Sequence, residues 1–155
     1  MGDIKLLIIE DDNNKNKQII SLIEETFPEE SIITEAHSFQ KGVKELRLNK
    51  FDILLLDMTL PSFDIDTNHT GGSIRKFAGI DILSDMKRQN IKLATIIVTQ
   101  FDSFGEGKDR ITIKELREQL TLDFEENFKG IIYYNSSLTT WRSELIKTII
   151  ILKGG

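Results

Sequence analysis

The sequence predicts an α/β fold in which a parallel β-sheet is covered by helices on both faces. Two observations lead to this prediction: five short aliphatic segments, and segments with helical periodicity between them. Several aliphatic segments are apolar at nearly every position, which is typical of strands that are buried on both faces. Because strand and helix alternate five times, we expect right-handed crossovers and a doubly wound sheet.

The five strands are expected at residues 5–9, 32–36, 53–56, 93–98 and 131–134. Pro28 closes the first helix, and the motif Thr112-Ile-Lys-Glu115 predicts a capping box that opens the fourth. The apolar residues that mark the helices are Ile19, Leu22, Ile23 and Phe27 in the first, Val43 and Leu46 in the second, Ile82, Leu83 and Met86 in the third, Leu116, Leu120 and Phe124 in the fourth, and Trp141, Leu145, Ile149 and Leu152 in the fifth.

Two polar segments, at about residues 62–78 and 101–111, interrupt the alternation and are expected to be long loops. Loops of this length are uncommon in compact domains and often carry function. The 155 residues otherwise fit one domain, which we expect to span residues 1–155.

Composition narrows the possible functions. The chain has no cysteine, which excludes disulfides, thiolate catalysis and cysteine-ligated zinc. Its formal charge of −5 argues against nonspecific binding to nucleic acid or anionic membranes. No apolar run approaches the roughly 20 residues of a membrane span, and the first residues do not resemble a signal peptide. We therefore expect a cytoplasmic protein with no nucleic-acid or membrane partner for this domain.

Acidic residues follow two of the expected strands: Glu10 and Asp11 follow the first, and Asp57 follows the third. In a sheet of order 2-1-3-4-5 these strands are neighbours, so their acids would converge at the carboxyl edge, where such sheets bind ligands. Clustered carboxylates repel one another, and Mg²⁺ would relieve that repulsion. Mg²⁺ held by acids suggests phosphoryl transfer. Thr99 would add a hydroxyl to the same edge, and a carbonyl near Thr59 could face the metal.

The motifs IIEDD (8–12), DMTLP (57–61) and VTQ (98–100), together with the fivefold alternation, resemble a response-regulator receiver domain, the aspartate-phosphorylated module of two-component signalling. The resemblance implies a flavodoxin-like fold with Asp57 as the phosphoacceptor. It implies Glu10 and Asp11 as the metal-binding pair, with Asp11 a direct ligand. Thr59 would offer its backbone carbonyl to Mg²⁺, and Thr99 would be the switch hydroxyl. The implied partners are a sensor histidine kinase or phosphotransfer protein, a downstream protein target and, in a homodimer, a second copy of the chain.

The sequence departs from the receiver pattern at the end of the fifth strand. Receivers carry a lysine at the end of the fifth strand, whereas this chain has Tyr134 there, followed by Asn135. Neither residue is a cation. One hypothesis is that a cation from an insertion replaces the lysine; the candidates are Arg75, Lys76, Lys108 and Arg110.

The sequence is also compatible with two other functions. Asp64-Ile-Asp66-Thr67 spells the nucleophile motif of haloacid-dehalogenase-like phosphatases, but the strand that should precede it has already ended at Asp57. We therefore expect no enzyme beyond a phosphoacceptor that catalyses its own phosphorylation. The stronger rival is a pseudo-receiver, a protein-interaction module that is not regulated by phosphorylation. The missing lysine favours this rival, whereas the intact acids and Thr99 oppose it.

Overall fold

The centre of the protein is a five-stranded parallel sheet in the order β2-β1-β3-β6-β9. The computed structural model describes residues 3–64 and 73–154. The sheet order confirms the predicted order 2-1-3-4-5 and the predicted fold class. The strands are β1 (Ile4–Ile9), β2 (Ser31–Ala36), β3 (Ile53–Leu56), β6 (Ala94–Thr99) and β9 (Phe128–Tyr133).

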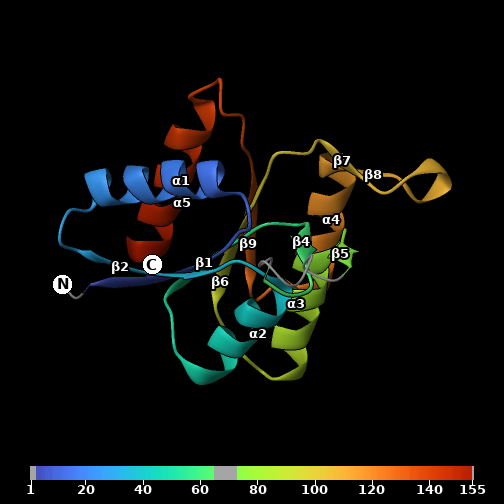
Figure 1. Cartoon of the computed structure of the whole chain (residues 1–155), viewed down its shortest axis with the longest axis horizontal. Coiled ribbons are helices and arrows are strands. Elements are labelled where there is room, and N and C mark those ends of the chain that lie inside the picture. The colour runs from blue at the N-terminus through green and yellow to red at the C-terminus, as the bar shows by residue number, and fades with distance from the viewer. Residues whose placement is uncertain (1–2, 65–72, 155) are drawn as a thin grey trace.

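Five α-helices cover the sheet on both faces (Figure 1). On one face lie α1 (Asn13–Thr26) and α5 (Thr140–Gly154); on the other lie α2 (Phe39–Leu48), α3 (Ala78–Arg88) and α4 (Ile113–Asp123). Successive residues of β1 enter opposite layers: Leu7 packs with α2, α3 and α4, and Leu6 packs with α1 and α5. Double coverage explains why the strands are apolar without alternation. No helix among residues 3–64 and 73–154 combines the length and apolar character of a membrane span.

Local signals in the sequence set the helix ends. The Asp12 side chain caps α1 by accepting a hydrogen bond from the backbone of Lys15, and α1 ends at Thr26, before Pro28. Thr112 and Glu115 form the predicted capping box at the start of α4, with each side chain bonded to the backbone of the other residue.

Short antiparallel strand pairs accompany both of the predicted long loops, and the pair in the second insertion is a hairpin. At the first insertion, β4 (Leu60–Pro61), which directly precedes it, pairs with β5 (Ile74–Arg75). In the second, β7 (Ser103–Phe104) pairs with β8 (Ile111–Thr112), and a 3₁₀ turn, η1 (Gly107–Asp109), lies between them. The buried ring of Phe104 anchors the second hairpin to the core. Strands of two residues have too little periodicity to be recognised in the sequence.

Strand β9 begins at Phe128, earlier than the predicted residue 131. The reason is a β-bulge: Thr95 pairs with Phe128, but the next residue, Ile96, pairs with Gly130. Gly130 has a φ of 154°, a conformation that favours glycine. Lys129 and Gly130 break the apolar run at the bulge, which hid the first half of the strand.

Candidate functional site

Three carboxylates from two strand ends meet at the carboxyl edge of the sheet. Oxygen atoms of Glu10, Asp11 and Asp57 all lie within 4.8 Å of one another. The in-register pairing of Ile9 with Leu56 brings the two ends together, and the Asp57 amide donates to the carbonyl of Ile9 at 3.0 Å. Glu10 and Asp57 are buried, whereas Asp11 is exposed. The structure thus assembles the acidic cluster expected from the sequence.

A buried lysine lies inside the same cluster. Lys15, from the first turn of α1, is fully buried, and its Nζ lies 2.5 Å from Glu10 Oε1 and 3.3 Å from Asp57 Oδ1. The ammonium also donates a hydrogen bond to the carbonyl of Val98 at 2.7 Å. Lys15 therefore joins the ends of three adjacent strands, β1, β3 and β6.

Sequence reasoning missed Lys15, although a signal was present. Lys15 lies four residues before Ile19 and eight before Ile23, both of which are buried on the inner face of α1. Residues at this spacing share one face of a helix. A lysine that continues an apolar stripe toward an acidic strand end marks a buried ion pair, because an unpaired charge is costly to bury.

Burial and charge shift the pKa values within the cluster. Burial, followed by the charge of Asp57, raises the pKa of Glu10 to about 8, against the opposing effect of Lys15. Burial and the same neighbouring charge raise the pKa of Asp11. Burial lowers the pKa of Lys15, but Asp57 and Glu10 raise it by more, so its net shift is upward and the ammonium stays protonated.

The cluster fits a divalent cation. With all groups ionised, the three carboxylates and one ammonium leave a net charge of −2, which one Mg²⁺ would neutralise. Ligand distances of about 2.1 Å allow two oxygens on one Mg²⁺ to be at most about 4.2 Å apart. Since the carboxylate oxygens lie within 4.8 Å of one another, two acids can bind directly and the third through water after small side-chain shifts.

The carboxylate of Asp57 is held by one oxygen. Oδ1 accepts a hydrogen bond from the Met58 amide at 2.8 Å and faces Lys15. Among the residues that the structure describes, no hydrogen-bond donor contacts Oδ2. The two oxygens are therefore not equivalent, and Oδ2 is the one available to a ligand.

Helix α3 packs directly on the segment that follows Asp57. The Gly79 amide donates to the carbonyl of Met58 at 3.0 Å. A Cβ at Gly79 would lie 3.0 Å from Met58 Cε and 3.2 Å from Met58 Cα. Glycine therefore permits the close contact that fixes the backbone next to Asp57.

The two predicted threonines lie at the edge of the site. Thr99 ends β6 and is fully buried, and its Oγ1 accepts a hydrogen bond from the Phe101 amide at 3.1 Å. Thr59 donates its hydroxyl to the carbonyl of Lys76 at 3.0 Å, which ties the segment after Asp57 to the first insertion. That the Thr59 carbonyl binds metal and that Thr99 acts as a switch stay predictions.

Comparison with known proteins decides the family. No family model matches the sequence. The chain is 36% identical over 148 residues to the Detocs response regulatory protein DtcB of Enterobacter cloacae (strain JD6301), and the match covers 94% of this chain and 98% of that protein. The chain belongs to the response-regulator family.

Solved receiver structures share the fold of this response regulator. The receiver domain of the Francisella response regulator 1452 aligns with a TM-score of 0.59 at 20% identity, covering 97% of this chain and 98% of that chain. RcsB from Salmonella enterica serovar Typhimurium, bound to promoter rprA in the presence of phosphomimetic BeF₃⁻, aligns with a TM-score of 0.64 at 18% identity, covering 97% and 99%. These matches confirm both the resemblance to response-regulator receivers and the fold class predicted from the sequence.

In this receiver domain, the residue at the usual lysine position lies beside the buried ammonium. The Tyr134 ring centroid is 5.9 Å from Lys15 Nζ, at the outer limit of a cation–π contact. The Tyr134 hydroxyl donates to Gln18 Oε1 at 2.9 Å, and its ring packs on Trp141 at 4.9 Å. Asn135 instead stabilises the turn before α5, where its side chain accepts a hydrogen bond from the Ser137 amide.

Two of the four insertion cations form ion pairs with carboxylates outside the acidic cluster. Arg75 pairs with Asp81 at 3.4 Å, and Lys76 pairs with Glu106 at 3.6 Å. Neither pair involves Glu10, Asp11 or Asp57, and the hypothesis that an insertion cation reaches the acidic cluster stays a prediction. The remaining candidates are exposed and pair with no carboxylate among residues 3–64 and 73–154: Lys108 and Arg110.

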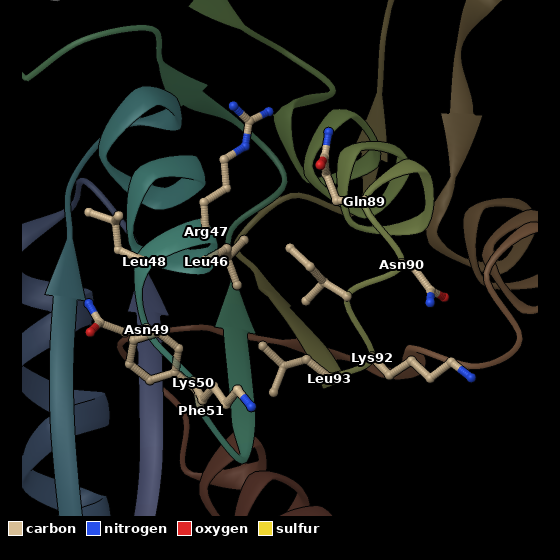
Figure 2. A pocket seen from close by; sticks show the side chains of 11 residues that line it. Leu46, Arg47, Leu48, Asn49, Lys50, Phe51, Gln89, Asn90, Lys92 and Leu93 are labelled. Atoms are coloured by element: carbon tan, nitrogen blue, oxygen red, sulfur yellow. The ribbon is translucent and has the colours of Figure 1, made fainter.

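A hollow of about 680 Å³ lies at the opposite edge of the receiver sheet (Figure 2). Residues 46–51 and 89–93, which precede β3 and β6, line it, so it lies at the amino ends of strands whose carboxyl ends carry the acids. Leu46 and Leu93 point into the hollow, and Lys92 points away from it. The candidate site is therefore the acidic edge and not this hollow.

Proposed function

We propose that this receiver domain accepts a phosphoryl group on Asp57 in a Mg²⁺-dependent phosphorelay. The observation that supports the proposal is the convergence of Glu10 and Asp11 on Asp57, whose Oδ2 meets no hydrogen-bond donor from the described part of the chain. A protein-interaction scaffold has no physical need to bury like charges together, because their repulsion destabilises the fold.

In this proposal, some residues of the cluster would bind Mg²⁺ and others would orient the carboxylate of Asp57. Mg²⁺ would be held by Asp11, Asp57 and the Thr59 carbonyl, with Glu10 bound through water, and it would neutralise charge on the transferring group. The Met58 amide and Lys15 hold Asp57 Oδ1, so Oδ2 is the atom that attacks phosphorus. The P–N bond of a phosphohistidine breaks as the Oδ2–P bond forms, and the donor imidazole keeps the electron pair.

The phosphodonor would be a sensor histidine kinase or a phosphotransfer protein, and the output would be contact with a downstream protein or a second copy of the chain. Thr99 would leave the Phe101 amide and turn its hydroxyl toward the new phosphoryl group. In this proposal the domain is a cytoplasmic phosphoacceptor that catalyses only its own phosphorylation, and it is not an enzyme acting on other substrates.

The test is phosphorylation by a small donor. The protein is incubated with acetyl phosphate and Mg²⁺, and the peptide containing Asp57 is weighed by mass spectrometry. We expect a phosphoryl adduct on the wild type, none on Asp57→Asn, and none when EDTA removes Mg²⁺. The control is Asp12→Asn, which keeps a good helix cap next to the site and should be labelled normally. An unlabelled wild type that still binds protein partners would favour the pseudo-receiver.

A further inference from the structure

We propose that Lys15, delivered by helix α1, is the cation that pairs with the phosphoryl group on Asp57. This inference rests on the proposed phosphorylation of Asp57. It assigns to a residue at the start of α1 the charge that other receivers place at the end of the fifth strand.

The geometry places the ammonium where it can exchange one partner for another. An ammonium has three donors, and here they face Glu10, Asp57 and the carbonyl of Val98. Formation of the acyl phosphate removes the charge of Asp57 and so weakens its attraction for Lys15. The donor that faced Asp57 Oδ1 then becomes available to a phosphoryl oxygen, while Glu10 and Val98 keep Nζ in place.

The charge balance supports the same role. With Mg²⁺ bound, the resting cluster is neutral: three carboxylates against one ammonium and one divalent cation. Phosphorylation replaces the charge of Asp57 by about −2 on the phosphoryl group. The phosphorylated site then carries −1 with Lys15 and −2 without it. Lys15 thus halves the excess negative charge in a buried site, where like charges repel strongly.

Contacts around Lys15 make it a rigid component of the site. Lys15 is fully buried, so its ammonium exchanges no hydrogen bonds with bulk water. Tyr134, at the usual lysine position, packs its ring beside Nζ and bonds through its hydroxyl to Gln18, one turn further along α1. Tyr134 therefore occupies the usual lysine position and, through its hydrogen bond to Gln18, helps to hold the helix that carries Lys15.

The test compares Lys15→Met with Lys17→Met, since Lys17 is an exposed lysine on the same helix. Two quantities are measured by isothermal titration calorimetry: the affinity for Mg²⁺, and the affinity of the Mg²⁺-bound protein for beryllofluoride, which mimics the phosphoryl group. We expect Lys15→Met to weaken beryllofluoride binding at least tenfold, as for loss of a hydrogen bond to a charged group. We expect it to tighten Mg²⁺ binding several-fold, because the cluster loses a repelling cation. Lys17→Met should leave both unchanged.

Changes of opposite sign are the signature of the proposed role. If Lys15→Met weakens both affinities, the lysine only supports the fold; if it strengthens both, the lysine is a counter-ion that blocks the site. Unchanged beryllofluoride affinity in Lys15→Met, in a protein whose wild type binds it, also overturns the inference and leaves the proposed function standing. A wild type that neither binds beryllofluoride nor accepts the phosphoryl label contradicts the proposed function itself, and the role of Lys15 with it.

A wild-type measurement covers the case in which Lys15→Met does not fold. Lysine side-chain NMR signals are recorded with Mg²⁺, before and after addition of beryllofluoride, and the Lys15 signal is assigned with Lys15→Arg. We expect the Lys15 signal to shift and the Lys17 signal to stay in place. A Lys15 signal that does not move would overturn the inference.

Discussion

The hydroxyl of Thr99 takes part in a hydrogen bond with the loop that follows β6. Its Oγ1 accepts a hydrogen bond from the Phe101 amide, so the proposed movement of the hydroxyl toward Asp57 would break a hydrogen bond in the loop that follows β6. The resting position of the loop and the direction of the hydroxyl are therefore coupled through one contact.

This coupling predicts the effect of Thr99→Val, which keeps the side-chain shape and removes the hydroxyl. We expect the free energy of unfolding to fall by about 1 kcal/mol, the typical net value of one neutral hydrogen bond, and Asp57 to remain a phosphoacceptor. Urea denaturation and the mass of the labelled peptide measure the two effects. Thr99→Ser, which keeps the hydroxyl, is the control for the beryllofluoride-induced change in amide spectra; if Thr99→Val shows that change in full, Thr99 is not the switch.

Glu10 gives the metal-free protein an unusual dependence on pH. Its pKa is raised from 4.5 to about 8, so the folded protein holds a proton that the unfolded chain releases. Stability from this group is complete below pH 4.5 and is lost as pH rises toward 8. Between these two pKa values the contribution of Glu10 makes the free energy of unfolding fall by at most about 1.4 kcal/mol per pH unit.

We expect Glu10→Gln, which cannot titrate, to lose stability less steeply than the wild type between pH 5.5 and 7.5 in EDTA. Urea denaturation at several pH values provides the measurement, and the difference between the two proteins isolates Glu10 from other titrating groups. Parallel stability curves for the two proteins would show that the Glu10 pKa is not raised.

At the scale of elements, the start of α3 is held against the chain beyond Asp57. Gly→Ala within a helix usually gains about 0.5–1 kcal/mol, but a Cβ at Gly79 would press on the backbone of Met58. We expect Gly79→Ala to lower the free energy of unfolding despite the better helix propensity, and to slow phosphorylation by displacing Asp57. Gly154→Ala is the control, since a Cβ there meets nothing within 4 Å. Equal effects of the two changes in thermal and urea denaturation would contradict the crowding at Met58.

Elements differed in how well the sequence predicted them. Strand β3 was predicted at its observed bounds because all four of its residues are buried and apolar. The acids were found because strand ends of a parallel sheet converge at one edge. Lys15 could not be predicted from apolar periodicity alone, because a charged residue whose partners lie on other strands can occupy the same helix face as the apolar residues. Those partners depend on tertiary packing and have no local pattern.

At the scale of the whole molecule, repulsion among the carboxylates at the acidic edge lowers the stability of the fold, and a bound cation would reduce that repulsion. A ligand at ten times its dissociation constant adds about 1.4 kcal/mol to the free energy of unfolding. We expect Mg²⁺ to raise the melting temperature of the wild type and to do so much less in Asp11→Asn. Asp12→Asn, which removes the same charge one residue away and outside the cluster, should respond like the wild type. Identical responses of the two variants would exclude Asp11 as a ligand.

Thr112 belongs to two structures at once: it is the last residue of β8, and its side chain caps α4. No linker separates the second hairpin from the helix, so there is no flexible segment between them that would let the hairpin move independently of α4. A protein that binds this hairpin and displaces it would therefore also move the first turn of α4.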